Sequence, residues 1–221
     1  MRVQSSRVRS RISRWVAALL AACSATAGAA VGPPEKEGLK LGFIKLTDMA
    51  PLAIAYEKGF FEDEGLYVTL EAQSNWKVLF DGVISGVLDG AHMLAPMPLA
   101  AATGVTTSAE VIAPLTLSYN GAAITVASAV WAEMKPNVAM ADGKPVHPIS
   151  AAALTPVVES YRQAGKPFSL GMTFPIGTHN YLLRYWLAAG GIHPGYYAPA
   201  KGDNSGSVDA QALLSVVPPP Q

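Results

Sequence analysis

The chain has 221 residues, half of them hydrophobic, and its 16 basic and 16 acidic residues cancel to a formal net charge of zero. This composition is typical of a soluble globular protein with enough apolar material for a core, and it argues against disorder. Beyond the N-terminal segment there is no run of Lys and Arg, which excludes the electrostatic footprint of a nucleic-acid-binding protein.

The first 30 residues are predicted to be a secretory signal peptide. Basic residues from Arg2 to Arg14 precede a short apolar run from Trp15 to Ala22, and small residues follow as far as Ala30. An apolar run of this length is too short to span a bilayer as a stable helix. We therefore expect the mature protein in the periplasm or an equivalent extracytoplasmic space.

Residues 20–23, Leu-Ala-Ala-Cys, resemble a bacterial lipobox, in which the cysteine becomes the lipidated first residue of the mature protein. On this interpretation Cys23 carries a lipid anchor, which is the protein's only expected contact with the membrane. The alternative is ordinary cleavage after Ala27 or Ala30, which removes Cys23. Because Cys23 is the single cysteine, no disulfide framework is expected in either case.

Residues 36–127 are predicted to form one α/β lobe. Its predicted strands are residues 39–44, 67–71, 90–94, 110–117 and 122–127, and its predicted helices are residues 49–58, a segment reaching Leu88, and residues 98–102. Gly59 is the stop signal of the first helix, and Ser74 or Asn75 can cap the second. Strands that alternate with helices favour a parallel sheet.

Residues 128–221 are predicted to form part of a second α/β lobe. The segment 135–149 is rich in Pro, Gly and Asp and is interpreted as a surface loop that connects the lobes. After it, the pattern predicts a helix over residues 151–164, a strand over 168–174, a helix that begins at His179 and a strand over 213–217.

Five segments together resemble the nitrate-type substrate-binding proteins of ABC importers, a group that contains nitrate, nitrite and bicarbonate receptors. They are residues 41–66 (LGFIKLTDMAPLAIAYEKGFFEDEGL), 86–100 (GVLDGAHMLAPMPLA), 120–126 (NGAAITV), 177–197 (GTHNYLLRYWLAAGGIHPGYY) and 213–221 (LLSVVPPPQ). The resemblance implies an α/β, bilobal fold of the periplasmic-binding-protein type (type II) that closes on its ligand by a hinge. Members of this family continue past the point where this sequence stops, so the resemblance also implies that the second lobe is incomplete here.

The helix predicted to begin at His179 offers chemistry that suits nitrate. Nitrate is singly negative and only accepts hydrogen bonds, whereas a helix N-terminus supplies free backbone N–H groups and a positive potential. Gly177 and Thr178 lie at this end, and an imidazole adds a further N–H donor. From the residues alone there is an alternative without ligand contact. In it, Thr178 is only an N-cap and His179 is a solvated residue of the first turn. The family resemblance implies that His179 lies in the anion pocket.

Other polar residues are weaker candidates. Trp76, at the first turn of a predicted helix, is by itself typical of a core residue, but the resemblance implies a pocket tryptophan with an indole N–H donor. Thr47 and Asp48 follow a predicted strand and either cap the next helix or line the ligand cleft. His92 is predicted to be an interior histidine with hydrogen-bond partners. Ala122 departs from the family pattern, in which an amide side chain is common.

No motif indicates catalysis, a bound cofactor or a metal site. The predicted function is that of a non-catalytic, extracytoplasmic receptor that binds a small oxyanion, nitrate or nitrite, and delivers it to a membrane permease served by an ATPase subunit. The alternatives are a bicarbonate or organic-anion receptor, and a thiamine-pyrimidine-synthase-like enzyme of the same fold. A cytosolic nitrate sensor is a further alternative, against which the signal peptide argues.

Overall fold

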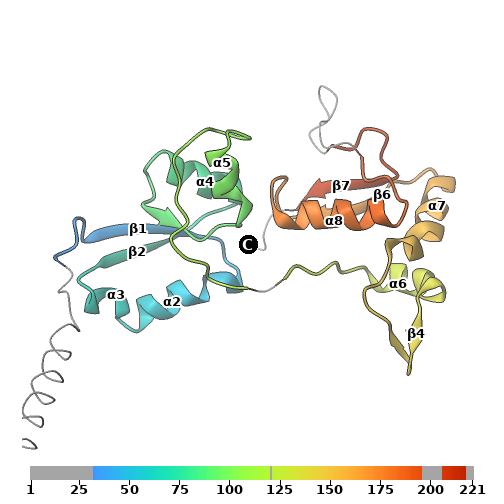
Figure 1. Cartoon of the computed structure of the whole chain (residues 1–221), viewed down its shortest axis with the longest axis horizontal. Coiled ribbons are helices and arrows are strands. Elements are labelled where there is room, and N and C mark those ends of the chain that lie inside the picture. The colour runs from blue at the N-terminus through green and yellow to red at the C-terminus, as the bar shows by residue number, and fades with distance from the viewer. Residues whose placement is uncertain (1–31, 120, 196–205, 218–221) are drawn as a thin grey trace, which may run out of the picture.

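The computed structural model describes residues 32–119, 121–195 and 206–217, so the predicted signal peptide and Cys23 lie outside the described residues. Two hydrophobic cores divide the described chain into a first unit, residues 38–111, and a second unit, residues 126–216. Figure 1 shows the two units and the extended segment of the chain that joins them.

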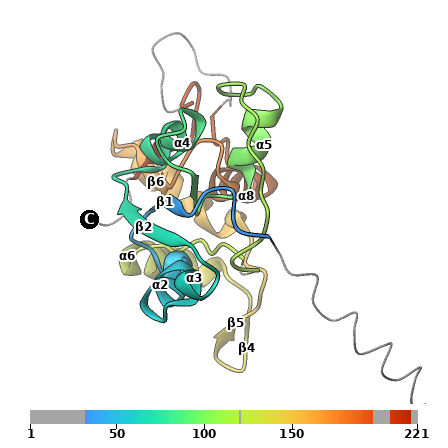
Figure 2. The same cartoon turned by 90° about the vertical axis from the view of Figure 1, so that its left-hand side faces the viewer.

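The first unit is built on a three-stranded parallel sheet of order β2-β1-β3. Its strands are β1 (Gly38–Phe43), β2 (Tyr67–Ala72) and β3 (Gly90–Ala91). Its helices are η1 (Thr47–Met49), α2 (Ala50–Glu57), α3 (Phe60–Asp63), α4 (Trp76–Ile84) and α5 (Pro96–Ala102). Helices α2 and α3 cover one face of the sheet and α4 lies on the other, as both views show (Figures 1 and 2). The strand and helix order predicted for this part of the chain is confirmed as far as α5.

Helix α4 illustrates how local sequence sets the element. The Asn75 side chain accepts a hydrogen bond from the backbone N–H of Val78 at 2.9 Å, so of the two predicted candidates, Ser74 and Asn75, it is Asn75 that caps the helix. The helix ends at Ile84, earlier than the pattern predicted, because Gly86 takes a positive φ of 74°. Leu88 instead packs on the sheet against Gly42. The contact is so close that a Cβ added to Gly42 would lie 2.6 Å from the Cδ1 atom of Leu88.

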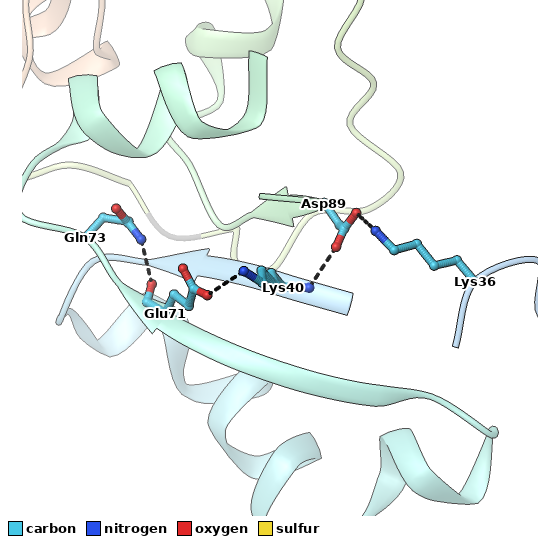
Figure 3. A network of polar contacts seen from close by, with 5 residues as sticks. All are labelled: Lys36, Lys40, Glu71, Gln73 and Asp89. Atoms are coloured by element: carbon cyan, nitrogen blue, oxygen red, sulfur yellow. Dashed lines mark hydrogen bonds and ion pairs between the residues drawn. The ribbon is translucent and has the colours of Figure 1, made fainter. Parts of the chain in front are cut away.

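An ionic network fixes the chain where it enters β1 (Figure 3). Asp89 accepts hydrogen bonds from the Lys36 Nζ at 2.5 Å and from the backbone N–H of Lys40 at 2.8 Å. These two contacts are the main reason why the pKa of Asp89 is lowered. The Lys40 Nζ lies 3.7 Å from a carboxylate oxygen of Glu71 on the neighbouring strand. The network joins β1 to β2 and to the residue before β3 at the surface of the unit.

The second unit contains a two-stranded parallel sheet of β6 (Phe168–Met172) and β7 (Ala212–Val216). Its other elements are α6 (Ser128–Met134), η2 (Lys135–Asn137), β4 (Met140–Ala141), β5 (Lys144–Pro145), η3 (Ala151–Leu154), α7 (Thr155–Gln163) and α8 (Thr178–Ala189). Its core is formed by buried side chains of the helices and strands, among them Leu154, Val157, Leu187 and Leu214. The predicted helices and strands after residue 150 are confirmed, with shifted ends.

The segment 135–149 does not connect the lobes, contrary to the prediction. It follows α6, whose Met134 already belongs to the second core, and it folds into η2 and the antiparallel pair β4–β5. Val138 and Ile149 pack against that same core. The Pro and Gly residues of this segment do indicate turns, but the turns belong to a hairpin within the second unit and not to a boundary between the units.

Residues 112–125 join the units, and the strands predicted at 110–117 and 122–127 are wrong. Among the described residues from 106 to 127 there is no helix or strand. Four large apolar side chains here are exposed: Ile112, Leu115, Tyr119 and Ile124. A strand needs a neighbouring strand to satisfy its backbone groups, and none of the described strands lies alongside this segment.

Candidate functional site

Helix α8 begins at Thr178, and its N-cap is Gly177, with no side-chain cap. The N-cap alternative for Thr178 is therefore wrong, and its side chain is exposed. Gly177 is buried, and an added Cβ would fit tightly, at 3.1 Å from Leu94 Cδ1 and 3.1 Å from the Phe174 carbonyl oxygen. The close approach to Leu94 brings this helix end against the first unit.

His179 is half-buried at the second position of α8. Its Nδ1 atom lies 3.2 Å from the Thr173 hydroxyl oxygen. If that hydroxyl donates to Nδ1, the imidazole proton is on Nε2, which then is a donor without a partner among the described residues. The backbone N–H groups of Thr178 and His179 likewise have no acceptor within the described chain. The helix end can thus offer several N–H donors to an anion.

A hydrogen-bonded chain along α8 holds this end in place. Asn180 is buried, its side-chain amide donates to the Pro175 carbonyl at 2.6 Å, and its carbonyl oxygen accepts from the Arg184 Nε at 3.0 Å. Arg184 also donates to the carbonyls of Pro194 at 2.9 Å and Gly195 at 3.1 Å. The loop before the helix is therefore fixed through a buried amide. Sequence reasoning missed Asn180, although an Asn and an Arg four residues apart in an apolar helix were a usable signal.

Trp76 and His92 form a buried polar pair in the first unit. Trp76 is 2% exposed and His92 is 5% exposed, and their rings meet edge to face with centroids 5.4 Å apart. The Trp76 Nε1 and both ring nitrogens of His92 are closed to solvent and have no hydrogen-bond partner among the described residues. His92 is interior, as predicted, but the hydrogen bonds expected for it are absent there.

Burial favours the neutral form of the His92 ring. Burial lowers its pKa below the usual 6.5, because a charged imidazolium would lose its hydration. The carboxylate of Asp48 acts in the opposite sense and raises the pKa of His92, but its effect is smaller. A neutral imidazole has one N–H donor and one acceptor nitrogen, so His92 contributes both kinds of group.

Thr47 and Asp48 do not cap the following helix. Both are exposed and belong to η1, and the N-cap of α2 is Met49 without any side-chain hydrogen bond. The capping alternative is therefore wrong, because the chain turns into the helix through a short 3-10 turn. Their place after β1 is at the carboxyl end of the parallel sheet, and the charge of Asp48 reaches His92.

The two units touch at the loop between β6 and α8. The core that contains Trp76 also includes Ile176, and Phe174 packs against that core, although both residues belong to the loop between β6 and α8. The loop that leads into His179 is therefore seated on the core of the first unit. No group of three or more His, Cys, Asp or Glu side chains is placed to hold a metal within the described part of the chain. In that same part, no helix has the length and hydropathy needed to cross a bilayer.

Comparison with known proteins identifies the chain's relatives. The NMT1-like family matches residues 32–221. The nitrate/nitrite binding protein NrtA of Nostoc sp. is 37% identical over 207 residues, which are 91% of this chain and 41% of that protein. The bicarbonate transport ATP-binding protein CmpC of Synechocystis sp. is 35% identical over 195 residues, 85% of this chain and 24% of that protein. The chain thus spans about two fifths or less of the length of these relatives.

A solved structure shows the same fold. The crystal structure of the periplasmic nitrate-binding protein NrtA from Synechocystis PCC 6803 matches with a TM-score of 0.59 and 33% sequence identity, over 85% of this chain and 43% of that chain. The expected α/β periplasmic-binding-protein fold and the resemblance to nitrate-type binding proteins are both confirmed.

Proposed function

The chain belongs to the NMT1-like family, and we propose that it binds nitrate or nitrite as a non-catalytic, extracytoplasmic receptor of an ABC importer. Relatives named as nitrate/nitrite binding proteins and a periplasmic nitrate-binding structure support this ligand and this location. Relatives named as ATP-binding subunits support an ATPase and a membrane permease as partners. A lipid anchor at Cys23 stays a prediction.

One observation carries the proposal: the loop that leads into His179 is seated on the core that contains Trp76. The first unit contributes the indole N–H of Trp76, which has no partner among the described residues, and the second contributes the open N–H groups at the start of α8. Such donors at a positive helix end suit an anion that only accepts hydrogen bonds. Because each unit supplies donors, a bound anion would hold the two units together.

Bicarbonate is the second candidate, because proteins of bicarbonate transport are among the relatives. Bicarbonate carries an O–H that needs an acceptor, and leaving such a group unpaired in a buried site costs about 1–3 kcal/mol, roughly five- to a hundredfold in affinity. The first turn of α8 offers mainly donors. We therefore expect nitrate or nitrite to bind more tightly than bicarbonate.

Calorimetric titration of the full-length protein with potassium nitrate, sodium nitrite and potassium bicarbonate tests this function. We expect His179→Ala to weaken nitrate binding at least tenfold, roughly the loss of one hydrogen bond to a charged ligand. Tyr185→Ala is the matched control, because Tyr185 lies on the same helix and is 75% exposed. Failure of the wild type to bind any of the three anions would refute the function, and equal nitrate affinity in His179→Ala would remove His179 from the site.

A further inference from the structure

The buried pair of Trp76 and His92 contains polar atoms whose hydrogen-bonding capacity is unsatisfied among the described residues. Three polar atoms in two contacting side chains, Trp76 Nε1 and His92 Nδ1 and Nε2, have no partner among the described residues and no exposure to water. Buried polar side chains in native proteins nearly always have partners, and an unsatisfied group is commonly explained by a ligand or an ordered water molecule. Three such atoms in two contacting rings are therefore a feature that needs a cause.

The chemistry of the pair defines what would satisfy it. Trp76 supplies one N–H donor, and the neutral ring of His92 supplies one donor and one acceptor. Two N–H donors match two oxygens of a small planar oxyanion, and the acceptor nitrogen matches a water molecule. In its neutral form the ring of His92 acts through hydrogen bonding and shape.

The pair lies in a core that both units help to cover. Phe174 and Ile176 of the β6–α8 loop pack on the core that contains Trp76, so part of the cover of this core comes from the second unit. His92 follows β3 directly, at the carboxyl end of the parallel sheet, where ligands of open α/β sheets bind. If the two units separated, this core would lose the part of its cover that Phe174 and Ile176 supply.

We propose that His92 is a further ligand-contacting residue, which donates an N–H to the same oxyanion as Trp76 and takes up a water molecule on its second ring nitrogen. The proposal rests on the proposed function, because it places His92 in that same anion site. It explains why a histidine occupies a buried position that an apolar ring could fill.

Two substitutions separate ligand contact from a purely structural role. His92→Phe keeps a ring against Trp76 and removes both polar nitrogens, whereas His92→Gln keeps a donor and an acceptor. Nitrate affinity is measured by calorimetry and the melting temperature by circular dichroism, both on the full-length protein without and with potassium nitrate. Trp76→Phe and the double substitution Trp76→Phe/His92→Phe complete a cycle that reports whether the two residues share one ligand.

We expect His92→Phe to lose about tenfold or more in nitrate affinity while its melting temperature without nitrate stays equal or rises, because unsatisfied polar atoms have been removed from the interior. His92→Gln should recover part of the affinity, and the losses in the double substitution should not add. Unchanged nitrate affinity in His92→Phe overturns the inference, and so does a fall in melting temperature without recovery by His92→Gln. If the wild type itself binds no anion, the proposed function fails first.

Discussion

At the residue scale, two buried polar residues of the described chain differ in whether their side chains have hydrogen-bond partners. Asn180 is 1% exposed and uses its amide to join the Pro175 carbonyl to Arg184, so its burial costs little. His92 is 5% exposed, and neither of its ring nitrogens has a partner among the described residues. The first pattern is that of a structural brace, and the second is that of a group kept for a ligand.

The lowered pKa of His92 predicts a pH dependence of stability. The folded protein disfavours the charged imidazole, so below the usual value of 6.5 the unfolded chain binds more protons than the folded one. The contribution of neutral His92 is fully present above 6.5 and is lost as the pH falls through the folded value. We expect the melting temperature to fall over this window, and His92→Phe to fall less.

Melting curves between neutral and mildly acidic pH, recorded for the wild type and His92→Phe, measure this difference. His147→Gln is a suitable control, because it removes a histidine that is exposed. Parallel curves for the wild type and His92→Phe would show that burial of this ring does not perturb its titration.

At the scale of elements, α8 and its surroundings position the candidate site. The C-terminal end of α8, where Gly190 is the C-cap, packs on η3. The indole N–H of Trp186, which lies on α8, donates a hydrogen bond to the Ile149 carbonyl at 2.7 Å. The other end is seated on the first unit through Gly177. The packing of α8 on the second core therefore fixes where its first turn, which contains His179, lies.

Gly190→Ala is predicted to disturb this packing. A Cβ at Gly190 would lie 2.5 Å from the Ala152 backbone nitrogen and 2.6 Å from the Ala151 carbonyl carbon, and backbone atoms cannot move aside as a side chain can. We expect a loss of about 1–3 kcal/mol in the free energy of unfolding, as for other overpacked sites.

Urea unfolding followed by tryptophan fluorescence measures this loss. Gly121→Ala is the control, because nothing lies within 4 Å of an added Cβ there, and its effect should stay within about 0.5 kcal/mol. Equal stability of the two variants would mean that α8 shifts on η3 without cost.

At the scale of the whole molecule, two cores are joined by residues 112–125, which contain no helix or strand among their described positions. Tyr119 is 95% exposed and Leu115 is 66% exposed in this segment. Exposed chain without ladder hydrogen bonds opens at little cost in free energy and is a preferred site of proteolysis.

Brief digestion with chymotrypsin is expected to cut first within residues 112–125, after Leu115 or Tyr119, and to release two fragments that correspond to the units. Mass spectrometry of the fragments identifies the cut. Saturating potassium nitrate should slow the cut at least severalfold if the anion holds the units together. First cleavage within α4 or β6 would show that the cores, and not the joining segment, are the less stable parts.

The sequence by itself determined the local elements and the family. Helix caps, glycine stop signals and apolar spacing predicted the first sheet, helix α4 with its Asn75 cap and the β6–α8 unit, because these signals act over a few residues. The resemblance of long segments predicted the fold that the solved relative shares. The same local signals misplaced the boundary between the units, since Pro and Gly mark a hairpin and an interlobe connection alike.

Only the tertiary structure decided which residues meet. Nothing in the order of residues shows that the loop at Phe174 and Ile176 rests on the core of Trp76, or that His92 lies edge to face with that indole without a hydrogen-bond partner among the described residues. The strands predicted at 110–117 and 122–127 failed for the same reason. A β pattern indicates which segments can form a strand. Whether they do depends on partner strands that are distant in sequence, and the packing of the whole fold decides whether such partners lie alongside.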